Sequence, residues 1–158
     1  MDTSKDNAML QHAVRLACES AKSGGGPFGA VVARDGVVLG EGANRVTLDR
    51  DPTAHAEVIA LRAACAASAS HTLSGAVLYT SCEPCPMCLA AAWWARVSRI
   101  VFCATRTHAA TAGFDDERLY AELSLPLGER ALPLHGALPE LSDQAFSLWR
   151  QNASRIPY

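Results

Sequence analysis

The sequence has few charged side chains, no basic run and no long apolar run. Of its 158 residues, 19% are charged, the formal net charge is −2, and two are lysine. Contact with nucleic-acid phosphates needs clustered lysine and arginine, so this composition argues against a large nucleic-acid footprint. No apolar stretch approaches the roughly 20 residues of a transmembrane helix, and the polar N-terminus has no signal-peptide core. We therefore expect a cytoplasmic protein with a small-molecule ligand, no nucleic acid and no membrane contact.

The remaining composition is that of one globular domain spanning residues 1–158. Hydrophobic residues make up 49% of the chain, and its length is sufficient to bury a core of its own. The six cysteines are more typical of free thiols or metal ligands than of disulfides in a cytoplasmic protein.

The apolar periodicity predicts an opening helix and hairpin, followed by strands that alternate with helices. We expect helices at 6–22, 54–67, 86–96, 117–123 and 140–152, with Thr53 as the N-cap of the second. Strands are expected at 28–33, 37–43, 76–80 and 100–104, with an edge strand at 132–134. This order indicates an α/β sandwich with a mixed sheet.

The most informative feature is a histidine and a glutamate followed by two cysteines. His55-Ala56-Glu57 and the later Pro84-Cys85-Pro86-Met87-Cys88 form the pattern H-x-E…P-C-x-x-C, which is typical of zinc-dependent nucleobase deaminases. His55, Cys85 and Cys88 are predicted to bind one Zn²⁺ and to leave its fourth position open for water. Glu57 is predicted to lie near that water and to act as general acid and base.

Both halves of this motif are expected at the start of a helix. The unpaired N–H groups and the dipole of a helix N-terminus favour the thiolate form of cysteine, which is the form that binds metal. A different interpretation stays open, in which Cys82 is a fourth ligand and the closed Cys₃His site is purely structural.

Two phenylalanines are candidates for lining a ligand pocket. Phe28 and Phe114 both lie in glycine-containing turns, where the backbone can approach a ligand closely. From the residues alone, Asp116 can be the N-cap of the helix at 117–123. Tyr158 can be part of a frayed terminus.

Several stretches beyond the metal motif resemble a known family. Over nearly its whole length the chain is similar to the cytidine deaminase superfamily, and it looks most like the bacterial guanine deaminases of about this size. The stretches that carry the resemblance are 25–30, 51–57, 79–88 and 112–116, together with the C-terminal Tyr158. The last two features point to guanine rather than cytosine.

This resemblance implies a three-layer α/β/α sandwich around a central five-stranded mixed sheet, with one zinc per subunit. It implies that Asn44 hydrogen-bonds the purine, and that Asp116 and Tyr158 recognise the guanine edge and assist proton movement. His55 or Phe28 would stack on the purine. By the same resemblance Cys82 occupies a position that is not a ligand.

The resemblance further implies a homodimer in which a C-terminal segment of about 138–158 is swapped between subunits, so that Tyr158 acts in the partner's pocket. The implied reaction converts guanine and water to xanthine and ammonia. Guanosine remains an alternative substrate, transfer-RNA adenosine is less favoured because the chain is not basic, and a non-catalytic zinc module is the alternative outside enzymes.

Overall fold

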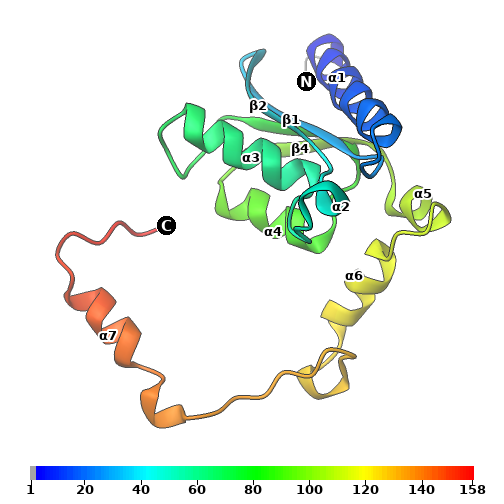
Figure 1. The fold of residues 1–158 in the computed structure, drawn as a ribbon. Helices are drawn as coiled ribbons and strands as arrows, with labels where there is room; N and C mark the ends of the chain where they lie inside the picture. The colour runs from blue at the N-terminus through cyan, green and yellow to red at the C-terminus, as the bar shows by residue number, and fades with distance from the viewer. Residues whose placement is uncertain (1–2) are drawn as a thin grey trace. The chain divides into compact units, whose positions relative to one another are not determined.

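The computed structural model describes residues 3–158, which fall into two units, Met1–Tyr120 and Ala121–Tyr158 (Figure 1). The first unit contains a mixed sheet of β1 (Gly29–Arg34), β2 (Val37–Ala43), β3 (Val77–Cys82) and β4 (Arg99–Ala104). The strand order is β2-β1-β3-β4, with β1 antiparallel to both neighbours and β3 parallel to β4. The predicted α/β class with a mixed sheet is thereby confirmed.

The expected fifth strand at 132–134 does not form, so the sheet has four strands among the described residues. A strand exists only through pairing, and the unit that contains these residues offers no strand to pair with. Pro133 also lacks the N–H that a ladder needs. The local sequence favours an extended segment here, but without a strand to pair with it this segment does not become a β-strand.

Helices cover both faces of the sheet (Figure 1). The helix α1 (Thr3–Lys22) packs on one face, where Ala13 meets Val31 and Tyr79. On the other face lie α3 (Ala56–Ala67) and α4 (Pro86–Trp94). The strand β1 serves both layers because its successive side chains point to opposite faces.

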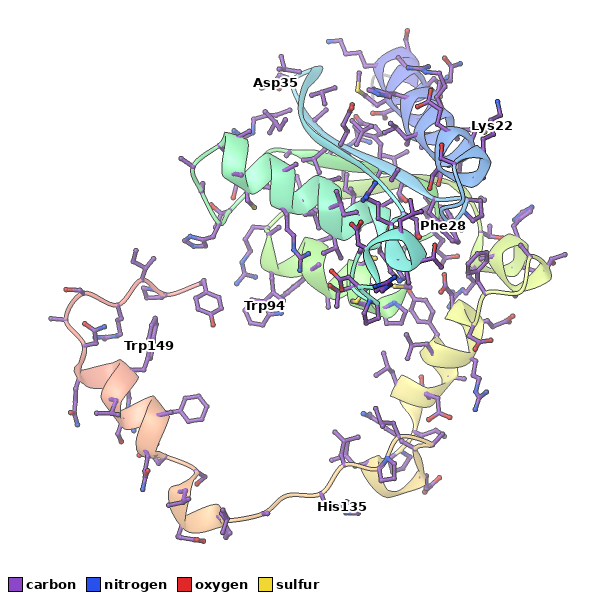
Figure 2. All side chains as sticks on the ribbon, viewed as in Figure 1. Lys22, Phe28, Asp35, Trp94, His135 and Trp149 are labelled. Atoms are coloured by element: carbon purple, nitrogen blue, oxygen red, sulfur yellow. The ribbon has the colours of Figure 1, made fainter. Side chains whose placement is uncertain are left out.

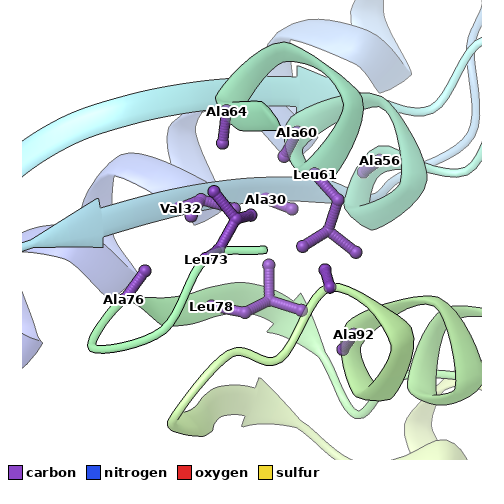
Figure 3. Packing of buried hydrophobic residues seen from close by; sticks show 11 residues of the cluster. Ala30, Val32, Ala56, Ala60, Leu61, Ala64, Leu73, Ala76, Leu78 and Ala92 are labelled. Atoms are coloured by element: carbon purple, nitrogen blue, oxygen red, sulfur yellow. The ribbon is translucent and has the colours of Figure 1, made fainter. Parts of the chain in front are cut away.

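The core under α3 is built mainly from alanine and leucine (Figure 3). Small residues let the helix approach the sheet closely. A Cβ placed on Gly42 of β2 would lie 2.5 Å from the Ala56 carbonyl oxygen of α3. Leu61, Leu73 and Leu78 fill the remaining space and are nearly or fully buried. This close packing fixes the first turn of α3, which carries part of the metal motif.

Two helix starts differ from expectation in an informative way. The N-cap of α3 is His55, not Thr53, because the Asp51 carboxylate accepts hydrogen bonds from both the backbone and the hydroxyl of Thr53. The stretch 44–53, expected to be a loop, contains the short helix α2 (Val46–Asp49).

The chain continues through α5 (Arg106–Thr111) into α6 (Asp116–Ser124), which begins in the first unit and ends in the second. The second unit then has two single 3₁₀ turns, η1 (Leu127–Glu129) and η2 (Pro139–Leu141), and the helix α7 (Gln144–Gln151). The helix expected at 140–152 is therefore divided into η2 and a shorter α7. Among residues 3–158, no helix has the length and apolar character needed to span a membrane.

Candidate active site

Three side chains of the motif converge as the spacing predicts. The donor atoms of His55, Cys85 and Cys88 all lie within 4.8 Å of one another. His55 Nδ1 is 3.7 Å from Cys85 Sγ and 3.5 Å from Cys88 Sγ. Imidazole nitrogen and thiolate sulfur at this mutual distance form a donor set suited to zinc. The three residues fit the metal that the motif implies.

Local backbone geometry explains why these donors meet. His55 is the N-cap of α3 and Cys85 is the N-cap of α4, each with extended backbone angles. Pro86 occupies the first turn of α4, where its missing N–H has no cost. Two helix N-termini therefore face one point, and their dipoles stabilise negative charge on the sulfurs.

The two sulfurs differ in their affinity for protons. A hydrogen bond from the Cys88 thiol lowers the pKa of Cys85 to about 4, and the same contact raises the pKa of Cys88. The hydrogen bond with Cys85 in turn raises the pKa of His55. The pair thus holds one thiolate at neutral pH even before any cation is considered.

Glu57 lies directly beside this cluster and is 4% exposed. Its carboxylate accepts a hydrogen bond from Thr80 Oγ1 at 3.2 Å and another from Cys88 Sγ at 3.4 Å. Burial raises the pKa of Glu57. A carboxyl whose pKa is raised by burial holds a proton more readily than an exposed one, which suits it to general acid–base chemistry.

Cys82 is not part of the metal-binding cluster, which among the described residues consists of His55, Cys85 and Cys88. Its thiol instead donates to the Thr105 carbonyl oxygen at 3.5 Å. Burial raises its pKa to about 11, so the sulfur stays protonated at neutral pH. A closed Cys₃His site is therefore not what this geometry offers.

A cavity of about 390 Å³ opens beside the cluster. It brings together seven residues predicted as site residues from widely separated parts of the sequence: Phe28, Asn44, His55, Glu57, Cys85, Phe114 and Asp116. The cavity is also lined by Gly24, Gly25, Gly26, Pro27, Val46, Thr47 and Glu83. A planar molecule in this cavity would lie among metal-donor residues and polar side chains such as Asn44 and Asp116.

Asn44 is held by the backbone around it. Its side-chain oxygen lies 3.4 Å from Gly26 N and 3.3 Å from Val46 N, and accepts from both. Ser20 Oγ donates to the Asn44 carbonyl oxygen at 3.0 Å. A Cβ on Gly26 would come within 3.0 Å of the Asn44 side chain. With its oxygen occupied, Asn44 offers its amide N–H groups as donors in the cavity.

Two aromatic rings form another wall. Phe28 and Phe114 meet edge to face, with centroids 4.7 Å apart and planes at 79°. Figure 2 shows Phe28 near the turn that leads into β1. Such a pair presents an apolar ring face to a flat ligand. Both residues line the cavity, and their contact with a ligand stays a prediction.

Asp116 begins α6 and lines the cavity. Burial raises its pKa. It is the first residue of α6 itself and not the N-cap before the helix, and its contact with the purine stays a prediction. Tyr158, the last predicted site residue, belongs to the second unit and is 73% exposed.

Sequence reasoning missed Glu83 and the α2 residues Val46 and Thr47. Glu83 stands two residues before Cys85, and its place in the metal-binding loop was the available signal. The α2 residues carried no such signal, because the stretch 44–53 reads as an ordinary polar loop.

Comparison with known proteins gives consistent matches. A model of the cytidine and deoxycytidylate deaminase zinc-binding region matches residues 3–104. A guanine deaminase of Bacillus subtilis is 47% identical over 94% of this chain and 96% of its own length. The crystal structure of the guanine deaminase from that organism superposes with a TM-score of 0.93 at 46% identity, covering 96% of this chain and 98% of its own.

Two more distant relatives extend the series. A guanine deaminase structure from Nitrosomonas europaea has a TM-score of 0.67 at 34% identity, over 69% of this chain and 64% of its own. A tRNA-specific adenosine deaminase of Haemophilus influenzae is 36% identical over 78% of this chain and 75% of its own length.

Proposed function

The chain belongs to the cytidine and deoxycytidylate deaminase family and to the same family as the Bacillus subtilis guanine deaminase, and we propose from this that it is a zinc-dependent aminohydrolase of guanine. The reaction takes guanine and water to xanthine and ammonia. One observation carries the proposal: His55 and Cys85 of the metal cluster line the same aromatic-walled cavity as the buried Glu57.

In this proposal His55, Cys85 and Cys88 hold one zinc ion. Zinc lowers the pKa of water to roughly 7 and so supplies the nucleophile of a hydrolysis at neutral pH. Glu57 takes one proton from the attacking water and gives it to a ring nitrogen of the purine. It then takes the second proton from the hydroxyl now on C2 and gives it to the amine, which leaves as ammonia. Its burial and raised pKa support this role.

The cavity also carries the groups needed to select a purine. Asn44 donates its amide N–H groups to an acceptor on the ring, since its oxygen is already bonded to the backbone. Phe28, Phe114 and His55 supply surfaces for stacking. Asp116 accepts hydrogen bonds from ring N–H or amino groups at the guanine edge.

We also propose a homodimer in which the segment of about 138–158 is exchanged between subunits and Tyr158 works in the partner's pocket. No residue of the second unit, all of which is described, is buried. Its helix α7 is amphipathic: Arg150 pairs with Asp143 at 2.8 Å, while Phe146 and Leu148 are 64% and 69% exposed. An apolar helix face of this kind is stable only when a second surface covers it.

The six cysteines are free thiols, and this supports a cytoplasmic location.

A substrate panel tests the base. Zinc-loaded protein is expected to release ammonia from guanine, and much more slowly from guanosine, cytosine or adenine. Turnover of guanosine without turnover of guanine would refute the guanine assignment and leave the deaminase chemistry in place.

Mixed subunits test the exchange. A chain with Glu57→Gln and a chain truncated before Tyr158 are each expected to be nearly inactive. Co-expressed, they form mixed dimers with one intact site, in which Glu57 of one chain meets Tyr158 of the other. Recovery of activity on mixing supports the exchanged tail, and its absence in dimers shown to be mixed would refute it.

A further inference from the structure

The helix α6 has little burial to hold it. It begins with Asp116, yet none of its residues, all of which are described, is buried. Most helical stability in proteins comes from packing an apolar face. A helix without such a face needs another attachment if its first residue is to keep a defined place at the cavity.

The structure supplies that attachment one turn later. Tyr120 lies four residues after Asp116, on the same face of the helix. Its hydroxyl donates to the Pro84 carbonyl oxygen at 2.8 Å. Pro84 is bonded directly to Cys85, so the phenol ties α6 to the segment that carries a metal donor.

A second side chain reinforces the tie. The Arg106 guanidinium lies over the Tyr120 ring, 4.4 Å from its centroid, at the distance of a cation–π contact. Arg106 also pairs with the Glu83 carboxylate at 3.3 Å, and its backbone N–H donates to the same carboxylate at 3.1 Å. Arg106 and Tyr120 therefore contact each other and bind the adjacent residues Glu83 and Pro84.

The opposite flank of Asp116 has its own anchor, the contact between Phe114 and Phe28. Asp116 thus lies between two attachments, one in the turn before α6 and one a single turn into it. Past Tyr120 the chain passes into the second unit, so Tyr120 is the last residue of the first unit and the last that can restrain Asp116 from within it.

We infer that Tyr120 and Arg106 are positioning residues, which hold α6 against Glu83 and Pro84 so that Asp116 faces the purine beside the metal cluster. The inference rests on the role proposed for Asp116. The attachment of α6 to Glu83 and Pro84 can be tested independently of that role. These contacts position Asp116 at the cavity and do not change the position of the zinc donors.

The test compares two tyrosine-to-phenylalanine variants of the full-length, zinc-loaded protein. Tyr120→Phe removes the bond to Pro84 and keeps the ring under Arg106. Tyr79→Phe is the matched control, because its hydroxyl makes a comparable 2.7 Å bond to Asp6 in the core, away from the cavity. Each variant is examined by amide hydrogen exchange, thermal unfolding, zinc content and guanine kinetics.

Tyr120→Phe is expected to speed exchange in 116–120, to leave zinc content unchanged, and to lower kcat/KM for guanine about tenfold, mainly through KM. Tyr79→Phe is expected to lower the Tm without changing exchange in 116–120 or the KM. Equal effects of the two variants on KM, or unchanged exchange in 116–120 after Tyr120→Phe, would overturn the inference.

A double-mutant cycle separates this inference from the proposed role of Asp116. In an Asp116→Asn background, Tyr120→Phe should cause little further loss of kcat/KM, because the two residues act on one contact. A full additional loss in that background would show that Tyr120 does not act through Asp116. If Asp116→Asn alone leaves guanine turnover unchanged, the role proposed for Asp116 fails, while the exchange data still decide whether the tie exists.

Discussion

The apolar residues of the two units differ in how far they are buried. In the first, Leu73 and Leu78 are fully buried in a core shared by helix and sheet. In the second, Leu132 is 77% and Phe146 64% exposed, and no residue is buried. Both units contain the side chains of a core, yet only the first assembles one. The first unit therefore carries its own stability together with the metal cluster, whereas the second has the composition of a segment that completes another surface.

The side chains with proposed chemical roles also divide between the two units. His55, Glu57, Cys85 and Cys88 are placed by α3 and α4, whose first turns are fixed by the core. Tyr158 belongs to the unit without a core. The proposed hydrolytic chemistry thus depends on elements that the core fixes, and the proposed contribution of the tail depends on assembly. Changes in the two units should consequently differ in size and in their dependence on protein concentration.

The largest effect is expected at the centre of the rigid unit. Glu57→Gln keeps the size of the side chain and removes its ability to carry a proton, so guanine turnover should fall by about 10²–10⁴. Zinc content and Tm should stay near those of the unchanged protein, because Glu57 is not a donor in the cluster. Zinc analysis and ammonia release measure both, and an active Glu57→Gln protein would show that another group moves the proton.

Two leucine-to-alanine changes test the difference in burial. Leu61 is 4% exposed, so Leu61→Ala should lower the free energy of unfolding by about 2–5 kcal/mol at any protein concentration. Leu148 is 69% exposed within its own unit. Leu148→Ala should therefore have little effect in dilute solution and should weaken the proposed dimer, which makes the Tm depend more strongly on concentration.

Denaturation at several protein concentrations and sedimentation distinguish the two outcomes. If Leu148→Ala lowered the free energy of unfolding by several kcal/mol at every concentration, the second unit would have a core of its own and the two units would not differ in this respect.

A smaller, pH-dependent effect is expected within the first unit. Asp6 of α1 accepts two hydrogen bonds from Arg99 of β4, at 2.7 and 3.0 Å, and one from Tyr79 of β3. The hydrogen bonds from Arg99, with that from Tyr79, lower the pKa of Asp6 below its usual 3.8. A carboxyl with a depressed folded-state pKa stabilises the fold above its unfolded-state pKa and loses that contribution as the pH falls through its folded-state pKa.

Asp6→Asn should therefore lower the Tm at pH 7, and the difference from the unchanged protein should shrink below about pH 3.8. Thermal scans of both proteins from pH 7 to acid measure it. A difference that is constant with pH would mean that the Asp6 charge does not contribute to stability.

The same contrast explains what could be predicted from the sequence. The metal cluster was predictable because its donors stand at helix starts, where spacing, a proline and the helix dipole act locally. The strand expected at 132–134 was wrong because pairing depends on a distant partner. Thr53 was wrongly expected to cap α3 because Asp51 competes for it. Glu83 was missed although its position two residues before Cys85 was an available signal, and the fold then shows that it lines the cavity.

The smallest effect is expected at Cys82, the residue that spacing alone admits as a ligand. Its thiol donates to the Thr105 carbonyl oxygen, and a serine hydroxyl can make the same bond. Cys82→Ser should therefore leave zinc content and guanine turnover intact, whereas Cys85→Ser should lose both, because Cys85 is the sulfur whose pKa is lowered to about 4. Parallel metal analysis of the two variants decides the matter. Loss of zinc from Cys82→Ser would make the site a closed Cys₃His centre and would remove the open position that hydrolysis requires.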